Sequence, residues 1–197
     1  RITMQMDVIR IRKKLKKKLD EQRYEHTLGV AFTAMSLAMK YDVDLHKAEL
    51  AGLLHDCAKC MPDERKLHKC EKYNIPISET ERKNPSLLHS KLGAYLAEHK
   101  YGVKDPEILN AILYHTTGHA DMTMLEKIIF VADYIEPRRN KAPNLSKVRK
   151  LAFEMMDEAV CKIMKDTLSY LEKKNAVIDD ETMHAYEFYA SETKKKK

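Results

Sequence analysis

A histidine and an aspartate stand side by side where an apolar segment ends. His55 and Asp56 directly follow the stretch AGLL at residues 51–54, which has the composition of a buried helix. Polar side chains at the edge of a hydrophobic core require partners, because burying a polar group without a hydrogen bond is unfavourable by several kcal/mol. A metal ion would satisfy both side chains at once, and so would ordinary hydrogen bonds. Both interpretations are open at this point.

Similar polar residues lie in other apolar segments of the chain. His26, His89 and His115 are each on or at the end of a predicted apolar helix, and Asp133 lies inside IIFVADYI. For one such residue alone, a hydrogen-bonded position in the core is the simpler explanation. Together with the His-Asp pair they are spread over five helices, and helical bundles build metal sites from such inward-facing side chains. Four further histidines fall among charged residues and are expected at the surface: His46, His68, His99 and His184.

Mixed histidine and aspartate ligation favours a transition metal. Fe, Mn, Co, Ni and Zn accept imidazole nitrogen together with carboxylate oxygen, whereas Ca²⁺ and Mg²⁺ prefer oxygen alone. The residues do not distinguish among these transition metals. Neighbouring side chains on a helix point about 100° apart. His55 and Asp56 can therefore flank one ion only if the helix ends there, which the following residues allow.

The motif CAKC at residues 57–60 is an alternative metal motif. Cys57 and Cys60, with His68 and Cys70 downstream, have the residue types of a zinc site. A structural zinc site usually shows a second pair at regular spacing, and a thioredoxin-like redox motif belongs to a strand-helix context. The sequence shows neither feature, so we expect Cys57 to be buried and Cys60 to have no special role.

The positive charge of the chain is concentrated at its two ends. The net charge is +6, but residues 1–23 alone carry +6 and the terminal KKKK carries +4, which leaves −4 for residues 24–193. A nucleic-acid-binding protein shows a basic surface on its folded body. The charge distribution therefore argues against nucleic acid as a partner. The lysines within residues 13–18 are interpreted as a solvated helix face rather than as a phosphate or membrane contact.

The composition is that of an ordinary globular domain. With 197 residues, 44% of them hydrophobic, the chain is long enough for one sizeable core. No run approaches the roughly 18 apolar residues of a membrane span, and no signal peptide opens the chain. Four cysteines are too few for a disulfide framework. We therefore expect a cytoplasmic protein with no membrane partner.

Hydrophobic residues recur at helical spacing along nearly the whole chain, and no segment alternates as a strand does. Asp44 is a predicted N-cap, Thr123 and Glu126 form a predicted capping box, and Gly102 is a predicted helix stop. The pattern indicates an all-α fold with a single domain. The predicted helices cover residues 5–19, 23–40, 44–56, 62–73, 85–102, 105–118, 124–137, 146–175 and 179–189.

Five segments make the chain similar to a known family. EHTLGVA, AGLLHDCAK, LLHSKLGAYLA, YHTTG and LEKIIFVADYIEPRR occur in this order within residues 22–175. They resemble the YqeK family of bacterial HD-superfamily phosphohydrolases, which are metal-dependent enzymes. His26, the pair His55-Asp56 and Asp133 match the H…HD…D signature of that superfamily. The resemblance implies a single-domain HD-type helical bundle with a buried metal centre.

The resemblance also sets the expected domain boundaries. Residues 21–190 would form the HD-type phosphohydrolase domain. Residues 1–20 would form a basic N-terminal helix packed on the same domain. Residues 191–197 would form a basic, disordered tail.

The activity that the resemblance implies is symmetrical hydrolysis of diadenosine tetraphosphate to two ADP. The implied cofactor is a divalent transition metal, iron, as one ion or two. The residues that would act in catalysis are Asp56, His89 and His115. The implied metal ligands are His26, His55, Asp56 and Asp133. The implied substrate contacts are Arg23, Lys59, His89, His115, Thr116 and Arg139.

The residue types support this chemistry without the family name. Hydrolysis of a phosphoanhydride requires a nucleophilic water and neutralised phosphate charge. A metal held by two His and two Asp can lower the pKa of a water far enough to supply hydroxide near pH 7, and Asp56 could orient that water. Lys59 is a point-charge phosphate ligand and Arg139 a forked one. His115 could donate a proton or hydrogen bond to the departing phosphate.

Two other classes of function remain open. The chain could be a different HD enzyme, either a nucleotidase or a phosphodiesterase, or a non-catalytic module that senses nucleotides. The complete set of four implied ligands favours an enzyme. The sequence has no GKS/T loop and no GxGxxG motif, which argues against P-loop and Rossmann enzymes. The expected partner is a small nucleotide, and a homodimer is left open.

Overall fold

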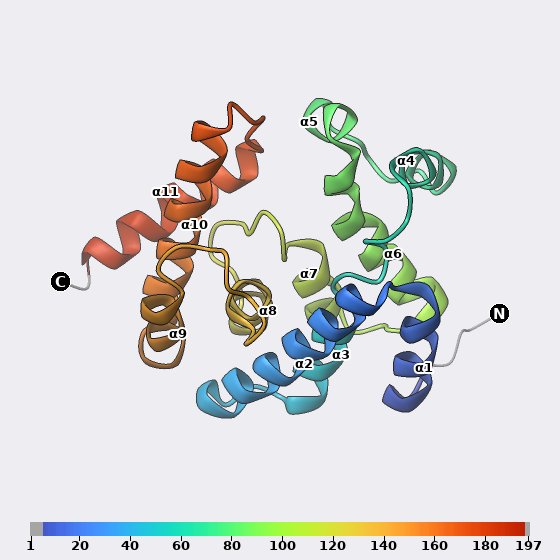
Figure 1. Ribbon diagram of the computed structural model, residues 1–197, viewed down its shortest axis with the longest axis horizontal. Helices are drawn as coiled ribbons and strands as arrows, with labels where there is room; N and C mark the ends of the chain where they lie inside the picture. The colour runs from blue at the N-terminus through green and yellow to red at the C-terminus, as the bar shows by residue number, and fades with distance from the viewer. Residues whose placement is uncertain (1–5, 196–197) are drawn as a thin grey trace.

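A computed structural model describes residues 6–195 of the chain, and within them all regular structure is helical (Figure 1). The all-α fold expected from the sequence is confirmed. The helices are α1 Val8–Lys18, α2 Glu21–Tyr41, α3 Leu45–Leu54, α4 Asp63–Lys72, α5 Glu79–Lys83, η1 Pro85–Leu88 (a 3₁₀ helix), α6 His89–Tyr101, α7 Pro106–Leu113, α8 Met124–Ile135, α9 Leu145–Glu154, α10 Met156–Lys173 and α11 Asp180–Lys195.

Local capping chemistry sets several helix ends. The Asp44 side chain accepts a hydrogen bond from the third backbone N–H beyond it and begins α3, as predicted. Thr123 and Glu126 exchange both bonds of a capping box at the start of α8. Gly102 ends α6 with φ of 77°, a left-handed conformation that glycine adopts without a Cβ penalty. These three predictions are confirmed.

Helix α8 lies near the middle of the molecule, because its sequence is apolar on almost every side. Ile128, Ile129, Val131 and Ala132 are completely buried. Helix α8 packs against α2, α3, α7 and α10. In Figure 1 the helices α9, α10 and α11 lie on one side of α8, and α4, α5 and α6 lie on the other. A helix in this position can carry a polar side chain only where other helices supply its partners.

The closest helix packing is between α2 and α3. A Cβ atom at Gly52 would stand 2.7 Å from the Cα of Ala31, a distance shorter than real contacts allow. The missing side chain therefore lets the two helix backbones touch. This contact fixes the end of α3, where the His-Asp pair lies, relative to α2. No helix among the described residues is long and apolar enough to cross a membrane.

Three predicted boundaries were wrong. The single helix expected over 146–175 is divided at Met155, which has φ of −146° and ψ of 78°. The break folds α10 back on α9 so that both helices also pack on α8, while the apolar spacing continues on either side of it. Residues 74–84 were expected as a loop but contain α5, whose capping box begins at Ser78. The helix expected over 105–118 ends at Leu113.

The two ends of the chain pack on the same body. Ile11 and Leu15 of α1 are completely buried, although the segment is rich in lysine. Helix α11 continues to Lys195, so residues 191–195 are helical and the expectation of a disordered tail is corrected there. The Tyr189 hydroxyl accepts a hydrogen bond from the Met122 backbone N–H at 2.8 Å and anchors this helix. Residues 1–5 and 196–197 lie outside the described residues.

Candidate metal centre and nucleotide groove

The implied metal ligands and the two further histidines meet in one buried cluster. His26 comes from α2, Asp133 from α8, and His55-Asp56 from the point where α3 ends. His89 begins α6, and His115 follows α7 directly after its last turn. The four histidines and Asp56 are each at most 8% exposed. Helix α3 ends at Leu54, so the neighbouring side chains of His55 and Asp56 can both face the same ion, as expected from the sequence.

His55, His89 and His115 share one local arrangement. The Nδ1 of each ring contacts the backbone carbonyl oxygen three residues earlier, at 2.6, 2.7 and 2.7 Å respectively. A carbonyl oxygen only accepts hydrogen bonds, so Nδ1 must carry the hydrogen in each case. The Nε2 of a neutral ring is then left with a lone pair, and it points into the cluster. Second contacts of this kind fix the orientation of metal-binding histidines.

The four implied ligands lie within reach of one another. His26 Nε2 lies 2.9 Å from Asp133 Oδ1 and 4.0 Å from Asp56 Oδ2. His55 Nε2 lies 3.4 Å from Asp56 Oδ2 and 3.8 Å from Asp133 Oδ1. One donor atom from each of His26, His55 and Asp56 can be chosen so that all lie within 4.8 Å of one another. The same holds for His55, His115 and Asp133.

Asp56 also faces the remaining two histidines. Its Oδ1 lies 3.2 Å from His89 Nε2 and 3.5 Å from His115 Nε2. These two nitrogens are 3.1 Å apart, and with Asp56 they form a third group of potential ligands. The carboxylate of Asp56 thus lies between two sets of histidine nitrogens.

The residues present fit a metal ion. His55 Nε2 is completely buried and has no hydrogen-bond partner among residues 6–195, and leaving such an atom unsatisfied is unfavourable by about 1–3 kcal/mol. Several imidazole lone pairs and two carboxylates converge on the same space, an arrangement that is attractive only around added positive charge. Histidine nitrogen with carboxylate oxygen is the donor set of a divalent transition metal.

The protonation states of His89 and of the two carboxylates favour ligation. Burial opposes protonation of His55, but the charge of Asp56 outweighs it and raises the pKa of that ring, so a metal would displace a proton from His55. Burial lowers the pKa of His89 to about 4, so its ring is neutral at pH 7. Burial alone would raise the pKa of Asp133, but the His26 hydrogen bond and the His55 charge outweigh it, and the pKa falls well below its usual range. Asp56 behaves in the same way, with His55 opposing the effect of burial. Both carboxylates are therefore ionised at neutral pH.

The implied anion contacts are only partly brought together. The guanidinium groups of Arg23 and Arg139 reach the cluster, since Arg23 Nη1 lies 2.8 Å from Asp56 Oδ2 and Arg139 Nη2 lies 2.9 Å from Asp133 Oδ1. Lys59 is half-buried, and burial lowers its pKa against the opposing charge of Asp56. Thr116 Oγ1 contacts Ser90 Oγ at 2.7 Å and both His89 and His115 at 3.3 Å.

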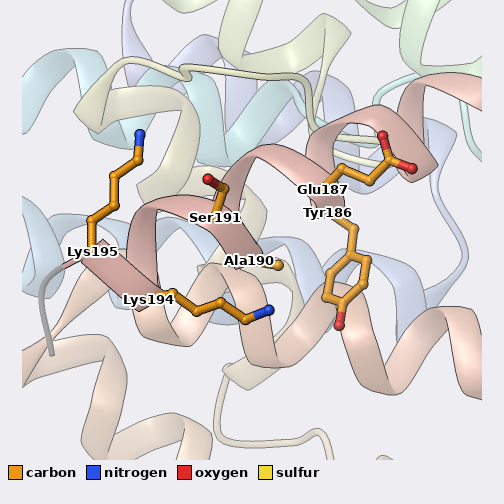
Figure 2. A pocket seen from close by; sticks show the side chains of 6 residues that line it. All are labelled: Tyr186, Glu187, Ala190, Ser191, Lys194 and Lys195. Atoms are coloured by element: carbon orange, nitrogen blue, oxygen red, sulfur yellow. The ribbon is translucent and has the colours of Figure 1, made fainter.

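A groove of about 1500 Å³ opens onto the cluster. Four of the residues singled out in the sequence line it, namely Arg23, His26, Asp133 and Arg139. Lys59 and Thr116 are not among its lining residues. A second hollow lies on α11 (Figure 2), but its lining side chains, which include Tyr186 and Lys194, all come from that one helix. The groove is therefore the candidate substrate site.

Two residues that support the cluster were missed in the sequence. Glu136, 1% exposed, accepts a hydrogen bond from His26 Nδ1 at 3.0 Å and so directs His26 Nε2 towards Asp133. The sequence did contain an indication of this role, because Glu136 is an acidic residue at the end of an apolar helix. Arg149 donates to the backbone carbonyls of Ile135, Glu136 and Arg139 at 2.8–3.1 Å and holds the turn after α8. Nothing in its local sequence marks that contact.

The CAKC segment does not form a metal cluster. Cys57 is buried, as expected, and its Sγ lies 3.6 Å from the Gly93 carbonyl oxygen. Cys60 is exposed and contacts the Asp20 carboxylate at 3.3 Å. No group of potential metal ligands within residues 6–195 includes a cysteine.

The helical bundle and the His/Asp cluster together define an HD domain. The HD domain family matches residues 23–138, and the chain belongs to this family. The resemblance to HD-superfamily proteins found in the sequence is thereby confirmed.

The relatives place the chain more narrowly. It is 42% identical over 177 residues to the Bacillus subtilis protein named symmetrical bis(5′-nucleosyl)-tetraphosphatase, covering 90% of this chain and 94% of that one. It is 38% identical over 186 residues to a Staphylococcus aureus protein of the same name, covering 93% and 95%. A crystal structure of a predicted HD superfamily hydrolase involved in NAD metabolism from Clostridium acetobutylicum is 37% identical, with a TM-score of 0.92 over 95% of this chain and 99% of that one.

Proposed function

We propose that this protein hydrolyses diadenosine tetraphosphate symmetrically to two ADP. The observation that carries the proposal is the complete His/Asp cluster, which includes the orphaned His55 Nε2 and lies at one side of a groove that Arg23 and Arg139 also line. The names of relatives at 38–42% identity over nearly the whole chain support the substrate. A buried set of ligands open to an anion-binding groove suits hydrolysis of a phosphoanhydride.

The residues that would hold the metal are His26, His55, Asp56 and Asp133, and we propose iron as that metal. When bound, a divalent transition metal lowers the pKa of a water and so makes a nucleophile available near neutral pH. In a two-ion centre, the alternative to this arrangement, His89 and His115 would hold the second ion through their Nε2 atoms, which already face Asp56. The donor set itself is equally suited to other transition metals.

The chain's own side chains would bind and orient the substrate. Arg23 and Arg139 would transfer part of their hydrogen bonding from Asp56 and Asp133 to phosphate oxygens, for which a guanidinium is well shaped. Asp56 would accept a hydrogen bond from the attacking water and so orient it. His115 can donate from Nε2 to the departing phosphate only when its ring is doubly protonated, because Nδ1 is already bonded to a carbonyl. Lys59 and Thr116 are proposed as further phosphate contacts.

Symmetry of the substrate makes the product pattern informative. A site that seats one nucleoside diphosphate beside the cluster brings the central anhydride to the nucleophile, and cleavage there yields two ADP. A site that positioned the cut one phosphate away would yield AMP and ATP. Chromatography of early products from diadenosine tetraphosphate, under reducing and iron-replete conditions, is expected to show ADP alone.

The variant His55→Ala is assayed beside the parent protein. It removes the fully buried proposed ligand and is expected to abolish the reaction. Equimolar AMP and ATP from the parent protein would overturn symmetrical cleavage. A nucleotide panel run in parallel covers the other functions. Turnover of only a mononucleotide or a cyclic nucleotide would assign a different HD enzyme, and binding without turnover of any nucleotide would assign a sensor.

A further inference from the structure

The groove extends well beyond the cluster. It begins at Arg23, His26 and Asp133, follows the turn over residues 138–144, and ends on the outer face of α10 at Tyr170 and Lys173. Its volume of about 1500 Å³ exceeds the roughly 300–1000 Å³ of most small-molecule sites. In the proposed function, the part beside the cluster holds one nucleoside diphosphate. The part along α10 is left without an assigned ligand.

An aromatic side chain is exposed at the far end of this groove. Tyr170 is 59% exposed, and no hydrogen bond of its hydroxyl is found within the described residues. The Lys174 Nζ lies over this ring, 5.9 Å from the ring centre. An open aromatic face beside a channel for phosphates is the arrangement on which nucleic-acid bases stack, and such stacking is indifferent to the identity of the base.

The charges at this end favour an anion. Lys141 and Lys173 line the groove, and neither makes an ion pair within the described residues. Two of the acidic side chains that line the groove already have partners, whereas Glu21 makes no ion pair within residues 6–195. Asp166 pairs with Lys162 and accepts a hydrogen bond from Asn144 at 3.1 Å, and Glu25 is paired with Arg138.

We propose that Tyr170 stacks on the second nucleoside base of a dinucleoside polyphosphate, and that Lys141 and Lys173 contact the phosphates of that half. This inference rests on the proposed function. It assigns a binding position to the second half of the dinucleoside polyphosphate, the half that becomes the leaving ADP. The groove thus has two nucleotide seats, one beside the cluster, formed by α2 and α8, and one farther along, formed by α10.

The test compares steady-state kinetics of variants on diadenosine tetraphosphate. Tyr170→Ala is expected to raise KM at least about fivefold, the lower bound for losing one base stack, and to leave kcat within about twofold. Tyr170→Phe keeps the ring and is expected to recover most of that loss. The matched control is Phe32→Ala, because Phe32 is an equally open aromatic, 54% exposed, that lies outside the groove.

Melting temperature and metal content distinguish a substrate contact from a structural effect, and both are expected to be unchanged in Tyr170→Ala. Lys173→Gln provides a second variant, for which KM is expected to rise more at low than at high salt. If the parent protein is active and both Tyr170→Ala and Lys173→Gln have the same KM as the parent, the second nucleotide seat is overturned. The proposed function is left intact by that result. A metal-loaded parent that forms no ADP overturns the proposed function, and the second seat falls with it.

Discussion

Asp56 Oδ1 lies 3.2 Å from His89 Nε2, although the only hydrogen of the neutral His89 ring is already bonded to a carbonyl at Nδ1. A lone pair and a carboxylate oxygen therefore face each other at contact distance. Burial opposes protonation of His89, whose pKa falls to about 4. A cation between the two residues is the remaining way to make the contact attractive. On the other side of Asp56, His26 Nε2 lies 2.9 Å from Asp133 Oδ1, and its Nδ1 donates to the Glu136 carboxylate.

Removing Asp133 is expected to strip the metal from the protein. Asp133 lies between His26 and His55, so its loss removes both a ligand and the charge that compensates a divalent ion. Elemental analysis of Asp133→Ala, purified without added metal, is expected to show at most a small fraction of the parent's content. Because metal binding is coupled to folding, its melting temperature should also fall. Asp166→Ala, in the same groove but outside the cluster, is the control. Equal metal content in both variants would show that Asp133 is not a ligand.

Replacement of Arg139 is expected to impair phosphate binding without affecting metal binding. Arg139→Ala should retain the metal yet lower kcat/KM by about 100-fold, the loss seen when a single charge-stabilising donor is removed. Arg65, an exposed arginine on α4, provides the control, and Arg65→Ala is expected to match the parent. Loss of metal in Arg139→Ala would mean that the arginine acts mainly by holding Asp133.

His115→Ala distinguishes a one-ion centre from a two-ion centre. If one ion sits among the four implied ligands, the variant should keep its metal and lose activity. If His89 and His115 hold a second ion, the metal-to-protein ratio should fall by half. We expect the first result, with activity reduced by about 100-fold or more, as is typical when a general acid is removed.

Glu136 is expected to control metal affinity without touching the metal. Its carboxylate fixes the ring of His26 through Nδ1. Outer contacts of this kind usually contribute 10- to 100-fold in metal affinity. Glu136→Gln keeps the size of the side chain but removes its charge, so competition with a chelator is expected to show weaker metal binding by about tenfold. An unchanged affinity would limit Glu136 to a structural role.

Gly29 offers an independent test of the same contact. A Cβ at Gly29 would stand 2.5 Å from Glu136 Oε2, so Gly29→Ala is expected to displace Glu136 and weaken metal binding as Glu136→Gln does. Gly93 is the matched control, because a Cβ there meets its nearest neighbours at 3.5 Å. Gly93→Ala should keep the metal and stabilise α6 by up to about 1 kcal/mol. Similar metal affinities in the two alanine variants would exclude the steric argument.

Alkylation should distinguish the two cysteines of the CAKC segment. Burial, together with the charge of Asp56, raises the pKa of Cys57 to about 12, so at pH 8 only about one thiol in ten thousand is the reactive thiolate. Iodoacetamide at pH 8 is expected to label exposed Cys60 and to leave Cys57 unlabelled in the native protein. Peptide mass spectrometry after labelling in guanidinium chloride, where both should react, is the control. Rapid labelling of native Cys57 would contradict its burial.

Features with a local cause were predictable from the sequence, and features with a tertiary cause were not. The caps at Asp44 and Thr123 depend on residues three positions apart, so a sequence pattern reveals them. The break at Met155 keeps the apolar spacing intact, because the reversal depends on where α8 lies. A continuous helix and two helices folded on each other therefore give the same pattern.

The same distinction applies to the site. His26, His55 and Asp133 stand out because polar side chains are rare in apolar helices, and the structure brings them together. Arg149 carries no such mark, since an arginine on a half-exposed helix face is ordinary. Its role depends on three carbonyls in the turn after α8, 10 to 14 residues earlier in the chain.

The two walls of the groove have different origins in the chain. The ligand cluster lies within residues 23–138, which match the HD family, whereas Tyr170 and Lys173 belong to α10, beyond that match. Mutations on the exposed face of α10 therefore leave the chemical apparatus untouched. If α10 seats the second nucleoside as proposed, substitutions on its exposed face change the affinity for dinucleoside substrates and leave the His/Asp cluster intact. Laboratory libraries aimed at new phosphate esters are best confined to that face.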